Sequence, residues 1–547
     1  MLTSKLVVAT LTFCYINSMA LKRFPIGVQD FARIRKDGKY YVDKTDLIYK
    51  MVHTDDYYFL SRPRRFGKSL LVSTLQYYFE GRKDLFTGFA MEKLETEWKK
   101  YPVFKLSFAG NKFTSLKALQ LTLNNMLAEF EKIYGVENTN DYEWGPRFGN
   151  ILKASHESTG MPPVVLVDEY DAPLLDSMEK PELQLTLKNE IRKLFSPLKD
   201  LGGILRFVFL TGISKFSQLS IFSELNNLNV ITMDDEYAAI CGITKEEVLT
   251  QMQPEIQSLA DKNQLSYDGA CDALTRLYDG YHFSKNSPDI FNPFSLISAL
   301  SKRELANYWF ATGTPTILTK LVNKYQMDAE QFSKGFAVAP EVFDAPTETA
   351  ENPIPMLYQS GYLTIKEYHA GEFAPYVLAF PNKEVEEGFT KSLLSYYTKQ
   401  NTAYSSVVSR VIHGMKDGNI DSVLEVIRAY MSGVPYDAES QNELHYKTIV
   451  YCVFSLATPY LTRCEEKSAA GRCDVVVETS DAVYMFEFKL DGKGSVDDAL
   501  RQIDDKGYLI PYSVTLDANG NSKKLFKIGV MFDLGKRTIG EWKVVEG

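Results

Sequence analysis

Apolar residues up to about residue 240 form short continuous runs that alternate with longer segments of helical spacing. The short runs cover 57–61, 101–108, 164–167 and 207–210. Residues 68–80 and 116–134, which lie between these runs, carry apolar side chains at helical intervals. Short buried strands that alternate with helices are typical of a mainly parallel, helix-covered sheet. The sequence therefore predicts an α/β domain in this part of the chain.

Beyond residue 240 the pattern becomes helical and then changes again. The segments with helical spacing are 243–252, 269–277 and 293–300. They predict a helical lid or a second subdomain. Prolines among acidic residues in 337–355 predict an exposed linker. Two apolar runs on either side of Gly371 predict a small winged-helix-like unit, and from about Glu384 the chain reads as helical to Leu456 and strand-rich afterwards.

Composition places the chain among ordinary globular proteins with several domains. A prior of ~150 residues per domain suggests three to four modules in 547 residues. The hydrophobic fraction of 45% and the charged fraction of 24% exclude a disordered or low-complexity chain. The net charge of −9 excludes a generally basic nucleic-acid binder, so any such binding must use local basic patches.

The six cysteines are scattered, without a CxxC pair or a histidine at zinc-finger spacing. We therefore expect neither a disulfide framework nor a structural zinc site, and this usage fits a reducing cytoplasm.

The N-terminus complicates the expected location. Lys5 precedes an apolar stretch that ends near Ile16, and small residues follow it to Ala20, as in a secretory signal. Two interpretations stay open. The chain is either a secreted enzyme or a protein whose true start is Met19, with an extension ahead of it, and we favour the second. No other run of ~18 apolar residues occurs, so we expect no membrane partner.

The loop between the first predicted strand and helix has the composition of a phosphate-binding loop. Gly67, Lys68 and Ser69 match the end of the G-x-x-x-x-G-K-[ST] pattern, in which backbone N–H groups surround phosphate, the lysine reaches its oxygens and the hydroxyl ligates Mg²⁺. Arg62 stands where the first glycine of the pattern belongs, and Arg64 and Arg65 are further candidates for phosphate contacts. The alternative is a helix N-terminus that Ser69 merely caps.

An acidic cluster follows the predicted strand at 164–167, where an NTPase needs one. Asp168 would hold Mg²⁺ through water, and Glu169 would polarise the attacking water. The alternative is a strand that ends in a solvated acidic turn. Thr211 ends the strand at 207–210, where a γ-phosphate sensor would lie, although a threonine at that place is more often structural.

Eight motifs together resemble the bacterial AAA-ATPase-like family, which typically carries a C-terminal PD-(D/E)XK nuclease domain. They lie at 23–27, 41–45, 62–69, 167–171, 210–214, 225–228, 278–283 and 292–295. The resemblance runs from about Leu21 to the C-terminus. It implies an AAA-like P-loop fold that binds ATP and Mg²⁺, and it implies that the arginine-rich loop without the first glycine is a tolerated variant.

Near the C-terminus, two apolar strands flank a polar turn at Ser480 and Asp481. A hairpin centred there pairs Val477 with Tyr484 and places Asp474 opposite Glu487. Opposed carboxylates repel each other unless a cation neutralises them. Lys489 shares the face of Glu487 because strand side chains alternate. Two acids and a base on one surface are what Mg²⁺-dependent phosphodiester hydrolysis needs, whereas the alternative is a surface ion-pair patch.

The order of polar residues resembles the PD-(D/E)XK fold, an α/β restriction-endonuclease-like domain. The matching positions are Glu443, Asp474, Glu487, Lys489 and Gln502. The resemblance implies that Asp474 and Glu487 bind metal and that all five belong to the active site. The proline that usually precedes the first acid is absent. The basic residues that could face DNA near this site are Arg463, Lys467, Arg472, Arg501 and Lys506.

We therefore expect an ATPase coupled to a Mg²⁺-dependent nuclease, with nucleic acid as partner, DNA ahead of RNA, and a homo-oligomer left open. The alternative is an NTP-dependent regulatory switch whose C-terminal domain binds nucleic acid or protein without cleaving it. The expected division is an extension over 1–20, an AAA-like domain over 21–240, a helical lid over 241–336, a linker with a winged-helix-like connector over 337–400 and a nuclease-like domain over 401–547.

Overall fold

The computed structural model describes residues 22–137, 143–214, 227–310, 316–329, 331–345, 352–398, 404–434, 443–457, 474–517 and 519–547. The expected N-terminal extension and the basic residues Arg463, Lys467 and Arg472 lie outside them. Two compact units share the chain: unit 1 comprises Met1–Thr312 and Ala337–Glu384, and unit 2 comprises Gly313–Phe336 and Val385–Gly547. The domain boundaries expected from the sequence stay predictions, and residues 337–400 fall in both units.

A five-stranded parallel sheet forms the centre of unit 1, as the alternating pattern predicts. Its strands are β1 (Tyr57–Ser61), β2 (Val103–Ser107), β3 (Val164–Asp168), β4 (Phe207–Gly212) and β5 (Asn229–Val230). Their order is β2-β3-β4-β1-β5 and every neighbouring pair is parallel. All residues of β1, β3 and β4 are buried, because helices cover both faces of the sheet.

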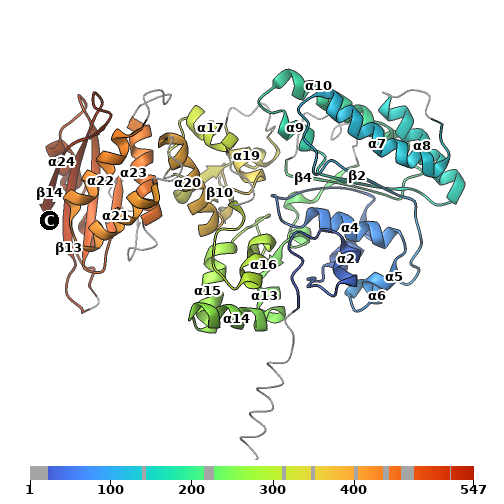
Figure 1. Ribbon diagram of the computed structural model, residues 1–547, viewed down its shortest axis with the longest axis horizontal. Coiled ribbons are helices and arrows are strands. Elements are labelled where there is room, and N and C mark those ends of the chain that lie inside the picture. Colours follow the sequence, from blue (N-terminus) through green and yellow to red (C-terminus); the bar gives the residue numbers. More distant parts are fainter. Residues whose placement is uncertain are drawn as a thin grey trace, which may run out of the picture. The chain divides into compact units, whose positions relative to one another are not determined.

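The covering helices separate into two layers (Figure 1). One layer contains α7 (Leu116–Tyr134), α8 (Trp144–Thr159) and α10 (Pro181–Phe195), and the other contains α2 (Phe31–Lys36) and α4 (Lys68–Phe79). Leu123, Phe148 and Ile191 of the first layer belong to one core with the strand residues Val165 and Leu210. The shorter helices are α3 (Thr45–Thr54), α5 (Lys83–Phe86), α6 (Ala90–Leu94), α9 (Ala172–Asp176) and α11 (Pro197–Asp200).

The helical segments expected beyond residue 240 are present and form a second core. They are α13 (Lys245–Gln251), α15 (Tyr267–Tyr278) and α16 (Pro293–Lys302). The helix α14 (Gln253–Asn263), which the sequence pattern did not single out, and the short strands β6 (Ile243–Thr244) and β7 (Ile290–Phe291) belong to the same region. Their core includes Ile256, Leu274 and Leu296, and Phe24 and Tyr40 of the N-terminal segment pack against it. The N-terminal segment therefore joins this helical extension.

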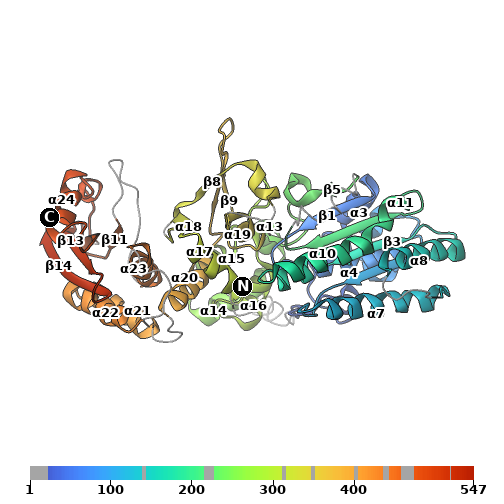
Figure 2. The same cartoon turned by 90° about the horizontal axis from the view of Figure 1, so that it is seen from above.

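The two strands predicted around Gly371 form an antiparallel hairpin, which Figure 2 shows as a projection from unit 1. β9 (Thr364–Tyr368) and β10 (Tyr376–Ala379) belong to a sheet of order β8-β10-β9 with β8 (Phe336–Val338).

The exposed linker expected at 337–355 is wrong for the described part of that range. It contains most of β8, a 3-10 helix over Pro340–Asp344 and the start of α19 (Ile354–Gln359), and Phe343 and Ile354 are buried. Pro340 and Pro355 lie in the first turns of these helices, where a missing N–H leaves no hydrogen bond unmade.

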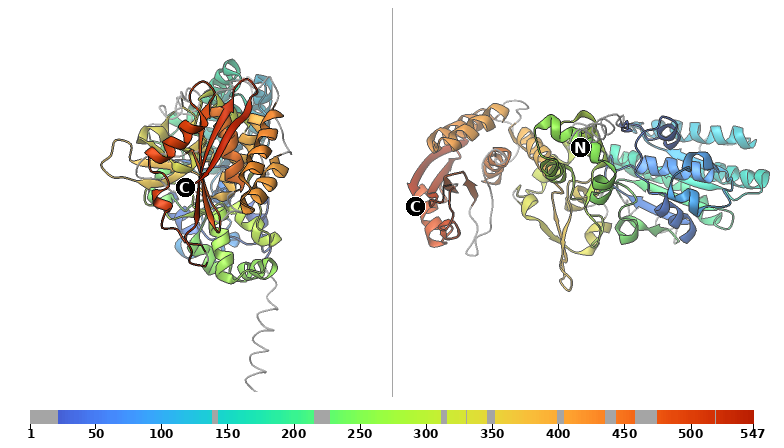
Figure 3. Two further views of the ribbon diagram at one scale, coloured as in Figure 1. Left: turned by 90° about the vertical axis from the view of Figure 1, so that its left-hand side faces the viewer. Right: turned by 90° about the horizontal axis from the view of Figure 1, so that it is seen from below.

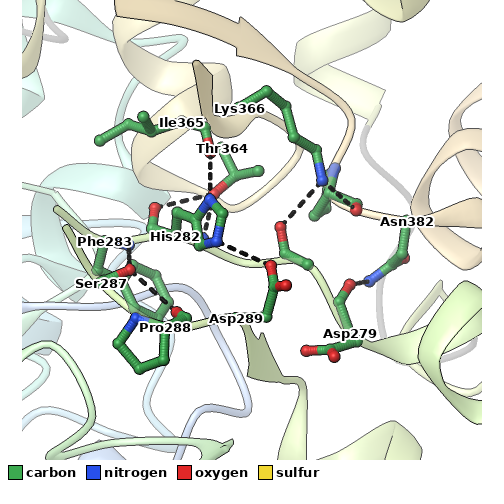
Figure 4. Close-up of polar contacts among 12 residues, drawn as sticks. Asp279, His282, Phe283, Ser287, Pro288, Asp289, Thr364, Ile365, Lys366 and Asn382 are labelled. Atoms are coloured by element: carbon green, nitrogen blue, oxygen red, sulfur yellow. Dashed lines mark hydrogen bonds and ion pairs between the residues drawn. The ribbon is translucent and has the colours of Figure 1, made fainter. Parts of the chain in front are cut away.

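The segment 278–283 connects this small sheet to the loop before α4. The rings of Tyr281 and Phe283 lie 4.8 and 5.3 Å from that of Phe66 in the loop. On the other side, the His282 N–H donates to the Thr364 hydroxyl over 2.8 Å, and Lys366 donates to the carbonyls of Gly280 and Pro381 over 3.1 and 2.7 Å (Figure 4).

Both imidazole nitrogens of His282 act as hydrogen-bond donors. Nδ1 lies 3.0 Å from the carbonyl oxygen of Ile365, which can only accept, and Nε2 lies 2.8 Å from Oδ1 of Asp289 (Figure 4). The hydrogen bond to Asp289 raises the pKa of His282, and the same bond lowers the pKa of Asp289. The charged imidazolium is therefore the form that this arrangement stabilises.

Replacing His282 with glutamine should destabilise unit 1 at pH 6 more than at pH 8.5. A raised histidine pKa contributes stability that is complete below the unfolded value of about 6.5 and is lost as pH rises through the folded value. Because the pair is partly exposed, we expect a loss of less than ~1 kcal/mol, or about 2 °C in Tm. Differential scanning fluorimetry at the two pH values measures it, and equal shifts at both would contradict the imidazolium assignment.

Unit 2 is built on a four-stranded mixed sheet. Its strands are β11 (Val475–Glu478), β12 (Ala482–Leu490), β13 (Lys524–Asp533) and β14 (Thr538–Glu546), in that order. β12 and β13 are parallel and the other pairs are antiparallel. Figures 2 and 3 show α24 (Val496–Asp505) on one side of these strands and α21 (Tyr404–Lys416) with α22 (Ile420–Ser432) on the other. The remaining helices are α17 (Thr316–Lys324), α18 (Gln331–Lys334), α20 (Lys383–Thr398) and α23 (Glu443–Ala457).

Candidate active sites

The loop between β1 and α4 has the backbone form of an anion-binding loop. Positive φ angles fall on Arg65 (70°) and Gly67 (93°), and α4 begins directly afterwards at Lys68. Arg62 is not among the residues with positive φ, so its place in the loop does not require glycine. This explains physically how the loop forms without the first glycine of the usual pattern.

Arg62 does not reach the space in front of the loop, contrary to its expected phosphate contact. Its side chain is buried and donates to the carbonyl oxygens of Ser61 and Thr232 over 2.9 and 2.8 Å, and to that of Tyr237 over 3.2 Å. Its guanidinium also lies 4.2 Å from the centre of the Phe283 ring. Arg62 therefore links the end of β1 by hydrogen bonds to the segment that follows β5.

A cavity of about 770 Å³ opens in front of the loop. The polar residues of its wall include Arg64, Arg65, Lys68, Ser69, Glu169 and Asp171. The apolar residues come from the N-terminal segment, such as Phe24 and Tyr40, and from the helical extension, such as Met252 and Phe294. One charged end and one apolar, aromatic end match the two halves of a nucleotide.

Lys68 is buried at the charged end. Its Nζ donates to the carbonyl oxygens of Arg62 and Pro63 over 2.8 and 3.0 Å. Burial lowers the pKa of Lys68, while the carboxylates of Asp171, Glu169 and Asp168 oppose the shift. The amine is therefore held by the loop beside three acids.

Asp168 and Glu169 follow at the carboxyl end of β3. Asp168 is 3% exposed, and its Oδ1 has no hydrogen-bond partner. Burial raises its pKa, and the Ser69 hydroxyl and Lys68 partly offset this. A buried carboxylate oxygen without a partner beside a serine hydroxyl fits a divalent cation that would occupy both.

Glu169 has a left-handed backbone, with φ of 54°. Such a conformation is uncommon for a residue with a side chain and is often found at functional sites. Burial and the neighbouring Asp168 raise the pKa of Glu169, which favours a group able to accept a proton near neutral pH.

The motif-based expectation missed Asp171, which lines the cavity. Its Oδ2 accepts the N–H groups of Ile213 and Ser214 over 2.8 and 2.7 Å, and its Oδ1 has no partner. Burial raises the pKa of Asp171 to about 6. Its position in the acidic cluster after β3 was the available signal. Thr211, expected as a sensor, instead donates its hydroxyl to the Leu60 carbonyl over 2.8 Å.

The second site lies at the hairpin of unit 2, whose expected register is confirmed. Val477 pairs with Tyr484, and Val475 pairs with Phe486. Continuing this register by one residue places Asp474 beside Glu487. Asp474 precedes β11, and its Oδ2 accepts the Phe488 N–H over 2.8 Å. The acid is thereby fixed to the strand that carries Glu487.

Glu487, Lys489 and Gln502 form one hydrogen-bonded group. Nζ of Lys489 lies 3.1 Å from Oε1 of Glu487 and 2.6 Å from Oε1 of Gln502. The amide nitrogen of Gln502, on α24, donates to the same Oε1 of Glu487. The structure therefore brings together the strand acid, the lysine and the polar helix residue that the sequence singled out.

Glu487 is poised to take a cation. It is 3% exposed, its Oε2 has no partner, and burial together with Asp474 raises its pKa to about 7. A divalent ion would remove both the burial cost and the repulsion. Among the residues that the structure describes, no group of three or more His, Cys, Asp or Glu side chains could hold a metal.

The helix that was expected to supply Glu443 supplies a lysine to the described site. Glu443 begins α23, and its side chain lies outside the part of the chain that the structure describes. One turn later, Nζ of Lys447 lies 3.1 Å from Oδ1 of Asp474. Sequence reasoning missed Lys447, although its spacing of four from Glu443 was a signal that both share a helix face.

No described helix is both long and apolar enough to cross a membrane.

Comparisons with known proteins agree with the two kinds of domain. A family model described as a predicted AAA-ATPase matches residues 25–222, and a model of the PD-(D/E)XK nuclease superfamily matches residues 441–542. The chain is 33% identical over 533 residues to "Uncharacterized protein in vnfD 5'region" from Azotobacter chroococcum mcd 1. The aligned region covers 95% of this chain and 98% of that relative. The two family matches confirm the layout inferred from the motifs.

Among solved structures, the chain is similar to the Aeropyrum pernix ORC1 protein in complex with DNA. The match has 9% identity and a TM-score of 0.23, over 64% of this chain and 93% of that one. A likeness this weak supports no argument about function.

Proposed function

The chain belongs to the family of predicted AAA-ATPases that carry a C-terminal domain of the PD-(D/E)XK nuclease superfamily, and from this premise we propose that it hydrolyses ATP in unit 1 and phosphodiester bonds of nucleic acid in unit 2. We further propose that the first reaction controls the second. DNA is favoured over RNA, and the cytoplasm supplies the nucleotide. The proposal includes no oligomeric state.

One observation carries the proposal. Each site contains a lysine and, beside it, a buried carboxylate oxygen that has no hydrogen-bond partner. In unit 1 the pair is Oδ1 of Asp168 with Lys68, and in unit 2 it is Oε2 of Glu487 with Lys489. Unpartnered buried oxygens are costly, and Mg²⁺ and a phosphate would satisfy the acid and the lysine together.

In unit 1, the backbone N–H groups of Gly67, Lys68 and Ser69 at the start of α4 would bind the phosphates. Arg64 and Arg65 line the same cavity and add positive charge. Ser69 and Asp168 would hold Mg²⁺. Glu169 would orient the attacking water and take its proton, for which its raised pKa is suited.

In unit 2, Asp474 and Glu487 would hold Mg²⁺. A bound Mg²⁺ supplies a water of lowered pKa and offsets charge on the phosphate. Lys489, anchored by Gln502, would orient that water or bind the scissile phosphate. The Phe488 N–H keeps Asp474 on the strand of Glu487.

A cleavage assay on supercoiled plasmid tests this function. We expect the full chain to nick or linearise DNA with Mg²⁺, to be inactive with EDTA, and to change rate when ATP is added. Asp474→Asn is the matched control, because it keeps the acceptor for the Phe488 N–H and removes the charge. No metal-dependent cleavage of DNA or RNA under any nucleotide condition would favour the regulatory switch instead.

A further inference from the structure

Lys447 and a metal ion require the same oxygen of Asp474. Oδ2 of that carboxylate accepts the Phe488 N–H, while Oδ1 lies 3.1 Å from the ammonium of Lys447. In the Glu487 carboxylate, Oε1 is taken by Lys489 and Gln502, and Oε2 has no partner. A cation held by both acids would find Oε2 of Glu487 without a partner, but at Asp474 it would compete with Lys447 for Oδ1.

The two lysines of the site differ in what they contact. Lys489 belongs to β12, carries the expected pattern and also contacts Gln502. Lys447 comes from α23, and its contact with Asp474 places a positive charge beside the second acid. Each carboxylate therefore has one ammonium within about hydrogen-bond distance.

We propose that Lys447 is a built-in counter-ion that keeps Asp474 in place and competes with divalent cations for its Oδ1, so that it sets the metal affinity of the site. This inference rests on the proposed nuclease function, because it assigns the regulation of that same site. Lys447 acts here through Asp474, which makes it a positioning residue.

The direction in which metal affinity changes when Lys447 is removed distinguishes competition with the metal from support of the fold. A lysine that only supported the fold would, when removed, weaken metal binding or leave it unchanged. A competing lysine would, when removed, strengthen it. Because the pair is partly exposed, with side chains 31% and 21% exposed, we expect the modest effect of a screened ion pair.

Manganese binding to the full chain, measured by isothermal titration calorimetry without nucleic acid or nucleotide, tests the proposal. Every variant, including the parent chain, carries Asp168→Asn, which removes the carboxylate proposed to hold the metal in unit 1. We expect Lys447→Met to bind Mn²⁺ about 5-fold more tightly than the parent chain, the size of a partly exposed ion pair. Lys447→Arg, which restores the charge, should return the affinity to the parent value.

The matched control is Lys523→Met. Lys523 forms a 2.7 Å ion pair with Glu478 at the opposite end of β11, so its loss removes a strand-end ion pair without touching Asp474. We expect its Mn²⁺ affinity to equal that of the parent. Measurable but equal or weaker binding by Lys447→Met would overturn the counter-ion role alone. No binding by either chain would overturn the proposed nuclease site and the inference with it.

Discussion

Glu487→Gln should lower metal-dependent cleavage by about 10³-fold or more, in the range seen when one member of a catalytic group is removed. The amide keeps the shape of the carboxylate and an acceptor for Lys489, but it removes the negative charge that would hold the cation. Initial rates of plasmid nicking at saturating Mg²⁺ measure the effect. Because Glu487 lies in unit 2, ATP hydrolysis without nucleic acid should be unchanged.

The same variant separates lost chemistry from lost folding. Burial raises the pKa of Glu487 to about 7, so the folded state holds its proton more tightly than the unfolded state does. Stability contributed by such a group falls as pH rises from about 4.5 to about 7, and the charged form is a cost at neutral pH. Without metal, Glu487→Gln should therefore have an equal or higher Tm at pH 7.5. An active variant, or an inactive one with a collapsed Tm, would contradict this account.

Lys68→Ala should weaken ATP binding by at least about 10²-fold, because the lysine is the buried cation nearest the phosphate end of the cavity. Fluorescence anisotropy of a labelled ATP analogue measures the loss. Truncation also removes a buried charge that two carbonyls and three nearby acids compensate, so thermal melting must accompany the assay.

Glu169→Gln is the matched control for Lys68→Ala. It should bind ATP as well as the parent chain and slow turnover by about 10²- to 10⁴-fold, the usual contribution of a general base. Normal ATP binding by Lys68→Ala would refute the loop assignment, and normal turnover by Glu169→Gln would remove Glu169 from the mechanism.

Local regularities account for the parts of this structure that the sequence could predict. The two-residue period of strands and a polar turn were enough to predict the pairing of Val477 with Tyr484, and hence the approach of Asp474 to Glu487. Likewise, apolar runs followed by Lys68 and by Asp168 predicted one site at the carboxyl ends of two parallel strands.

What the sequence did not predict depends on contacts between distant segments. Arg62 turns away from the cavity because carbonyl groups about 170 residues further along the chain accept its N–H groups, which no local pattern encodes. Lys447 meets Asp474 through packing of a helix beside a strand end. Pro340 and Pro355 contributed to the linker prediction, because their place in the first turn of a helix depends on the buried residues that follow them.

The interior place of β1 in its sheet affects how the chain is made. β1 is synthesised first but pairs with β4 and β5, and Leu60 is 151 residues before its partner Thr211. At 5–20 residues per second, a ribosome needs about 8 to 30 s to produce that partner. During this time the nascent strand, whose residues are all buried in the folded sheet, has no native neighbour on either edge. Folding of unit 1 must therefore wait for residues that lie far downstream, and the growing chain depends on protection from aggregation until they emerge.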